Sequence, residues 1–115
     1  MGIGAKMITP NQKLLFKKQA DIVKAIAHPL RIAIIDFLKD GPQCVCDIAE
    51  HTKAERSNVS RHLSTLVTAG VLAYQKQGLK VIYELKTPCI LGFVSCITGV
   101  LKQQAKENQQ LLKSL

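Results

Sequence analysis

The sequence predicts a winged helix-turn-helix fold, mainly α with a small β-hairpin, in a single domain that spans residues 1–115. Three observations lead to this prediction. Residues 43–69 contain two stretches of helical spacing separated by a short polar turn, which is the pattern of a helix-turn-helix. Residues 71–86 then change to an alternating period, which indicates a hairpin, or wing, directly behind the second helix. Residues 88–112 return to helical spacing, so the fold has about five helices and one wing.

Two helices are predicted before the helix-turn-helix. Thr9 followed by Pro10 is a helix start, because threonine caps free N–H groups and proline suits the first helical position. This helix ends before Pro29, where the second helix begins and runs to a turn at residues 40–42. The side chains expected to point inward from these two helices are Leu15, Ile22, Ile26, Leu30, Ile34, Phe37 and Leu38.

The helix-turn-helix and the wing follow. A short third helix over roughly residues 43–51 precedes a fourth over roughly 56–69, which Gly70 closes. Two strands come next, with Gly78 at the turn between them. The inward side chains predicted for the third and fourth helices are Val45, Ile48, Ala49, Val59, Leu63, Leu66 and Val67.

The last helix indicates a dimer. Its apolar side chains occupy nearly every direction around the axis, and a helix that is apolar all round must be buried all round. A domain of 115 residues covers only one side of it, and a two-fold related copy is the economical way to cover the rest. We therefore expect a homodimer through the first and last helices, which also gives two DNA-reading elements for a palindromic site.

Charge and composition favour a nucleic-acid partner. The chain has 16 Lys and Arg against 8 Asp and Glu, a formal net charge of +8, and a small domain this basic usually binds an anion. No apolar stretch reaches the roughly 20 residues that a membrane-spanning helix needs. With no secretory signal in residues 1–7, we expect a cytoplasmic protein. None of His28, His51 and His62 has a carboxylate or nucleophile at catalytic spacing, so no enzyme is predicted.

The fourth helix has the side chains that read DNA. Arginine suits guanine and phosphate, asparagine suits adenine, and serine adapts to either kind of contact. No Asp or Glu occurs between Arg56 and Lys80, which argues against an ordinary solvated face. Lysines beside the wing turn can reach phosphate or the minor groove, or can simply protect a strand edge. The candidate DNA contacts are Arg56, Ser57, Asn58, Ser60, Arg61, His62, Thr65, Lys76 and Lys80.

Four cysteines in a reducing compartment predict metal binding or thiol chemistry rather than structural disulfides. Cys44 and Cys46 are placed in the first turn of the third helix, where the helix dipole favours thiolates. Residues two apart point about 200° from each other on an ideal helix. Both therefore bind one ion only if that turn is distorted or still partly extended. Two thiolates are also fewer than the three or four that a soft ion prefers.

Cys89 and Cys96 share one face of the last helix but stand about 10.5 Å apart along it. This exceeds the Cα separation of about 7 Å that a disulfide tolerates, so they cannot bridge within one helix. Across an antiparallel dimer, Cys89 can approach the partner's Cys96. The alternative is that both are small buried hydrophobic side chains.

Three segments resemble the ArsR/SmtB family of winged-helix repressors. Residues 44–49 (CVCDIA) resemble the metal-binding signature of that family, and residues 59–63 (VSRHL) are similar to its recognition helix. Residues 28–32 (HPLRI) resemble the usual opening of its second helix, and the match extends over roughly residues 12–102. The resemblance implies a homodimeric repressor that binds double-stranded operator DNA and leaves it when a metal, metalloid or thiol oxidant reaches the cysteines.

The resemblance also implies an effector. It matches Cys44 and Cys46 to soft-ion ligands and implies that Cys89 or Cys96 supplies the remaining one. As(III) or Sb(III) is expected first and Cd(II) or Pb(II) second, with Zn(II) as a candidate for a second site. A repressor of the same fold that responds to thiol oxidation or persulfide is the alternative. A third possibility is a winged-helix protein-interaction module without operator specificity.

Two features depart from the family pattern at the expected effector site. Arsenic-sensing members often have a third cysteine in the same helix, where this chain has Ala49. Lead- and cadmium-sensing members use an N-terminal arm, whereas residues 1–43 hold no cysteine. A third departure affects DNA reading, because Arg56 stands where the family usually has glutamine.

Overall fold

A computed structural model describes residues 6–115 and confirms the predicted winged helix-turn-helix. Residues 1–5, which the predicted domain includes, lie outside this part of the chain. The elements in order are α1 (Pro10–Ile26), α2 (Pro29–Phe37), the 3-10 turn η1 (Leu38–Asp40), β1 (Gln43–Cys44), α3 (Val45–Thr52), α4 (Arg56–Thr68), β2 (Leu72–Gln77), β3 (Lys80–Leu85) and α5 (Cys89–Lys113).

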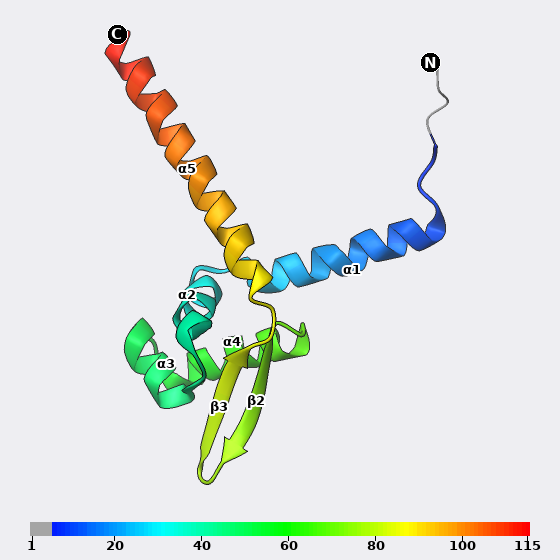
Figure 1. Ribbon diagram of the computed structural model, residues 1–115, viewed down its shortest axis with the longest axis vertical. Helices are drawn as coiled ribbons and strands as arrows, with labels where there is room; N and C mark the ends of the chain where they lie inside the picture. The colour runs from blue at the N-terminus through cyan, green and yellow to red at the C-terminus, as the bar shows by residue number, and fades with distance from the viewer. Residues whose placement is uncertain (1–5) are drawn as a thin grey trace.

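The molecule has a compact part and two long helices that project from it. Residues 29–85, here called the central domain, hold α2, α3, α4 and the strands, while α1 and α5 leave it in diverging directions (Figure 1). The Cα radius of gyration is 19.1 Å, against about 13 Å for a compact chain of this length. The excess reflects the two projecting helices.

Local signals start the first two helices where the sequence predicted. The Thr9 hydroxyl accepts a hydrogen bond from the Gln12 N–H at 3.1 Å, and Gln12 Oε1 accepts one from the Thr9 N–H at 2.9 Å. This reciprocal capping box satisfies two N–H groups that the helix itself leaves free. At the start of α2, His28 Nδ1 accepts from the Leu30 N–H at 3.1 Å.

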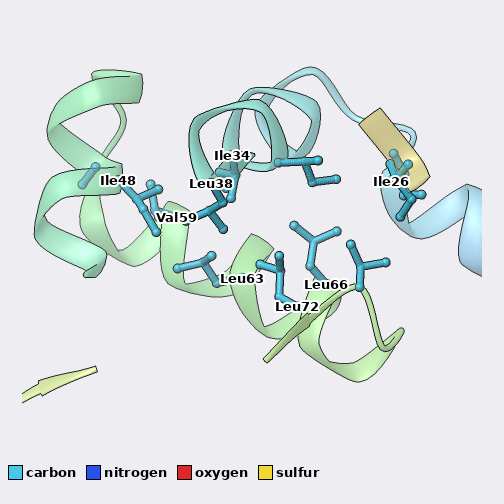
Figure 2. Close-up of a cluster of buried hydrophobic side chains, with 12 residues drawn as sticks. Ile26, Ile34, Leu38, Ile48, Val59, Leu63, Leu66 and Leu72 are labelled. Carbon is cyan, nitrogen blue, oxygen red and sulfur yellow. The ribbon is translucent and has the colours of Figure 1, made fainter. Parts of the chain in front are cut away.

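The core lies between α2, α3, α4 and the base of the wing. Figure 2 shows Ile34 and Leu38 facing the α4 side chains Leu63 and Leu66, with Ile48 at the α3 end of the cluster. The predicted core residues that the structure buries are Ile26, Ile34, Leu38, Ile48, Ala49, Val59, Leu63 and Leu66. Burial of this aliphatic set positions α4 with its polar face outward.

The prediction that Leu15 and Ile22 of α1 point into the core is wrong for the single chain. Leu15 and Ile22 are about half exposed, and only Ala25 and Ile26 at the end of the helix are buried. The reason is that α1 leaves the central domain, so nothing in the described chain covers its first turns.

The third helix begins later than predicted. Gln43 and Cys44 form the strand β1, which pairs antiparallel with β3 in a sheet of order β1-β3-β2. Cys44 lies opposite Ile82 in this pairing and has extended backbone angles of φ −82° and ψ 163°. The strand forms because the outer edge of β3 offers hydrogen-bonding groups to it. Cys44 therefore precedes the first helical turn instead of lying within it.

The wing and the last helix agree with the expected elements. Strands β2 and β3 pair from Leu72↔Leu85 to Gln77↔Lys80. Gly78 has φ 65° at the turn, a conformation that glycine adopts without steric cost. Helix α5 continues to Lys113. Within residues 6–115, no helix combines the length and apolar character needed to cross a membrane.

Candidate functional site

The outer face of α4 presents a row of polar side chains. Arg56, Ser57, Ser60 and Arg61 are exposed, whereas Asn58 is half-buried. The Arg61 guanidinium donates to Asn58 Oδ1 at 2.6 Å, which holds the two side chains together at the start of the helix. This face carries donors and acceptors of the kinds that contact base edges and phosphates.

His62 does not lie on this face, contrary to the prediction. Its side chain is buried, with 6% of the residue exposed. Its Nδ1 accepts a hydrogen bond from Arg31 Nε at 2.9 Å, and its ring centroid lies 4.4 Å from that of His28. The Arg31 guanidinium also donates to the Ala25 carbonyl at 3.1 Å. Arg31 therefore links His62 of α4 to α2 and to the end of α1.

Burial also determines the ionisation of this histidine. Desolvation is the largest cause that lowers the pKa of His62 below its ordinary 6.5, and the neighbouring basic side chains, His28 first, lower it further. The neutral ring is the form that can accept from Arg31 at Nδ1. In the sequence, Arg31 is marked only as part of the segment 28–32 and no contact is predicted for it, since nothing local indicates a bond to a residue 31 positions away.

Thr65 lies apart from the start of α4. It is half-buried, its hydroxyl donates to the Arg61 carbonyl at 3.2 Å, and it lines a groove between α1 and α4 with Lys18 and Asp21. Ser57 and Asn58 line a different hollow. The structure thus joins Thr65 to Arg61 through this hydrogen bond, while Thr65 lines a different groove from Ser57 and Asn58.

The wing lysines are exposed near the turn. Lys76 lies near the end of β2, and Lys80 begins β3 opposite Gln77. Within residues 6–115, neither lysine has a side-chain hydrogen bond or an ion pair. Both are therefore available to a ligand or to DNA phosphate.

Cys44 and Cys46 are both among the residues that line one small hollow. Cys44 is 5% exposed and Cys46 is exposed. The hollow has a volume of about 140 Å³ and also reaches Arg56 and Lys80. Its remaining lining residues are Val45, Leu79 and Val81. Cys44 and Cys46 can bind one ion only if the first turn is distorted or partly extended, and the backbone at Cys44 is extended. We call this hollow the thiol pocket.

Cys89 and Cys96 do not reach the thiol pocket in the single chain. Both are exposed on α5, and neither is among the residues that line the pocket. Across residues 6–115, no three His, Cys, Asp or Glu side chains gather closely enough to hold a metal ion. The expected third protein ligand is therefore not assembled within one chain.

Comparison with known proteins gives a consistent result. The family model described as "Bacterial regulatory protein, arsR family" matches residues 28–74. The arsenical resistance operon repressor of Staphylococcus xylosus is 33% identical over 70 residues, which cover 61% of this chain and 67% of that protein. The transcriptional repressor SdpR of Bacillus subtilis is 37% identical over 83 residues, covering 72% of this chain and 92% of that protein. The crystal structure of M. tuberculosis Rv0081 has a TM-score of 0.71 at 30% identity and covers 82% of this chain and 95% of that one.

Proposed function

Since this chain belongs to the ArsR family of bacterial regulatory proteins, we propose that it is a transcriptional repressor that leaves its operator when a thiophilic ion binds Cys44 and Cys46. The observation that carries this proposal is the thiol pocket. One hollow joins both thiols to the start of α4 and to the wing, the two elements that face DNA in this fold. An ion bound there acts directly on the DNA-reading elements. The family consists of regulators rather than enzymes.

Operator binding uses the exposed start of α4 together with the wing. Arg56, Ser57, Ser60 and Arg61 are accessible, and Lys76 and Lys80 extend the positive surface along the hairpin. The salt dependence of binding should be steep, because each neutralised phosphate releases counterions. A protein-interaction module of the same fold would show only a small salt dependence.

The active form is a homodimer that covers α1 and α5. Phe93, Ile97 and Val100 on α5 are about half exposed in one chain, as are Leu15 and Ile22 on α1. Exposed apolar faces of this length are unusual for a monomer and mark an interface. A two-fold partner covers them and sets two reading helices side by side for a palindromic operator.

The effector is As(III) or Sb(III) first, with Cd(II) or Pb(II) second. The name of the Staphylococcus xylosus relative supports this order. Arsenous acid condenses with the two thiols to form two As–S bonds and release two waters, with no change of oxidation state. To act as a switch, the bound ion must favour the form that does not bind DNA by a few kcal/mol.

The test is an anaerobic titration of the reduced protein with arsenite, followed by near-ultraviolet thiolate absorption. We expect saturation at one ion per protomer, loss of the signal in Cys44→Ser and in Cys46→Ser, and retention of most of it in Cys89→Ser and Cys96→Ser. The same Cys44→Ser protein should still bind a duplex selected from random-sequence DNA by the wild type, but arsenite should no longer release it.

The redox alternative gives a different result in the same assay. If a peroxide released DNA in chelated, metal-free buffer while arsenite, antimonite and cadmium gave no absorption, the thiophilic-ion proposal would be overturned in favour of thiol oxidation. Normal induction by arsenite in Cys44→Ser would also contradict the proposal.

A further inference from the structure

We propose that Arg56 and Lys80 make the thiol pocket selective for an effector that carries a negatively charged group of its own in addition to the atom that binds Cys44 and Cys46. This effector competes with DNA phosphate for the Arg56 and Lys80 side chains. The inference rests on the proposed role of Cys44 and Cys46. It adds the chemical class of the ligand and the means by which it displaces DNA.

The first observation is the composition of the pocket. Two cysteines, one arginine and one lysine are among the residues that line a space of about 140 Å³, and none of the lining residues is acidic. Arg56 comes from the first turn of α4 and Lys80 from the first position of β3, so two separate elements each contribute a cation to the pocket that Cys44 and Cys46 line. A hollow lined by one sign of charge attracts the opposite sign.

The second observation is that both cations are free of acidic partners. The ion pairs in residues 6–115 are Lys17–Asp21 and Asp36–Lys39, and no side-chain hydrogen bond within those residues involves Arg56 or Lys80. The acids nearest in sequence to the pocket residues, Asp47, Glu55 and Glu84, do not line the pocket. The guanidinium and ammonium donors can therefore bind an anion in the hollow without breaking an existing contact.

The third observation is the number of sulfurs. Arsenous acid that condenses with two thiols retains one hydroxyl, because two waters leave and the third As–O bond remains. No third cysteine lines the pocket, so that position is open to an exogenous ligand. A small external thiol can replace the hydroxyl with release of one more water. A carboxylate or similar anion on that ligand then lies beside Arg56 and Lys80.

Competition with DNA follows from the position of these two residues. Arg56 opens the helix that faces the major groove in this fold, and Lys80 lies at the wing turn. In addition, Cys44 lies opposite Ile82 where β1 pairs with β3, so the strand that contains Cys44 is hydrogen-bonded to the wing strand that begins at Lys80. An anion held in the pocket occupies cations that phosphate would otherwise engage.

Two aryl arsenicals that differ in charge test the selectivity. Hydrated phenylarsine oxide and 4-carboxyphenylarsine oxide each form two As–S bonds with release of two waters, and only the second adds an anion. Affinities of the full-length reduced protein are measured by competition with dithiothreitol. We expect the carboxylated compound to bind about fivefold more tightly, the scale of two exposed ion pairs.

Variants assign this preference to the two cations. In the double variant Arg56→Gln, Lys80→Gln the two arsenicals should bind equally. In Lys76→Gln, which removes a wing lysine that does not line the pocket, the preference should persist. Equal affinities in the wild type, or an unchanged preference in the double variant, overturn the inference while leaving the thiophilic-ion proposal intact. Arsenical binding that does not depend on Cys44 or Cys46 overturns both.

Salt dependence tests the competition. Loading the wild type with the carboxylated arsenical should reduce the slope of log K for DNA against log salt by about one to two, because up to two phosphate contacts are lost. The neutral arsenical should leave this slope nearer to that of the unloaded protein. The same slope with both compounds overturns the competition.

Discussion

The central domain and the two projecting helices differ in what covers their apolar side chains. In the central domain, Ile34, Ile48, Val59, Leu63 and Leu66 are fully buried by other parts of the same chain. Along α1 and α5, large apolar side chains remain about half exposed or more, and burial is limited to the turns next to the domain. One chain thus completes the core of the central domain but leaves the apolar faces of α1 and α5 for a partner to cover.

This difference separates stability from assembly. Substitutions in the central domain should change the free energy of unfolding of each subunit, since the contacts they remove are internal. Substitutions on the exposed faces of α1 and α5 should instead change the affinity between subunits. The predictions below test this separation, from the largest expected effect to the smallest.

The largest effect is expected in the core. Leu63→Ala removes a fully buried side chain from the face of α4 that packs on α2. We expect the free energy of unfolding to fall by about 2–5 kcal/mol, the cost of the lost burial and the cavity. Urea unfolding followed by circular dichroism measures it. Leu79→Ala is the control, because Leu79 is fully exposed at the wing turn and should change stability by less than about 0.5 kcal/mol.

A charge on α5 should separate the subunits. Ile97→Glu places a carboxylate on an apolar face that we propose to be buried in the dimer, so subunit affinity should fall by roughly 100-fold or more. Sedimentation velocity should show monomers with near-native circular dichroism. Gln109→Glu adds the same charge about 120° around the helix and should remain dimeric. A monomeric wild type, or a dimeric Ile97→Glu, would remove the basis for assigning these faces to a partner.

The sequence was sufficient for features that depend on neighbouring residues. The Thr9 cap, the Gly78 turn and the inward stripe of α4 are each set within a few positions, and all three are present in the structure. Features that depend on contacts between residues far apart in the sequence could not be predicted from local patterns. Cys44 is drawn into a strand by Ile82, and His62 is held inward by Arg31.

The thiol pocket shows the same limit at the candidate site. The Cys-Val-Cys spacing marked the two thiols, and Arg56 and Lys80 were marked only as DNA contacts. That these four residues line one hollow depends on the packing of α3, α4 and the wing. No periodicity or spacing within any one element encodes that arrangement.

A smaller, pH-dependent effect should come from His62. Its pKa is lowered in the folded protein, so the unfolded chain binds more protons as the pH falls below about 6.5. The stability that His62 contributes is therefore fully present above that pH and is lost as the pH falls toward its lowered folded pKa. Thermal unfolding between about pH 5 and 8 should show this slope, and His62→Asn should reduce it.

A matched histidine checks this assignment. His51 is exposed on α3 and stacks on Phe37 with a centroid distance of 4.0 Å. His51→Asn is the matched control, because it makes the same substitution at an exposed histidine that lacks the burial of His62. If both variants flattened the profile equally, the burial of His62 would not be its source.

The smallest effect compares two helix caps of the same kind in the two regions. Thr9 caps the far end of α1, whereas His28 caps α2, which packs into the core. Thr9→Ala removes about 1 kcal/mol of capping free energy, and because that end projects from the domain, the loss should appear as fraying. Hydrogen exchange should accelerate about fivefold in the first turn of α1, with the unfolding midpoint of the central domain unchanged. His28→Ala should instead lower that midpoint, because α2 cannot fray without opening the core. A lowered midpoint in Thr9→Ala would show that α1 contributes to the stability of the central domain.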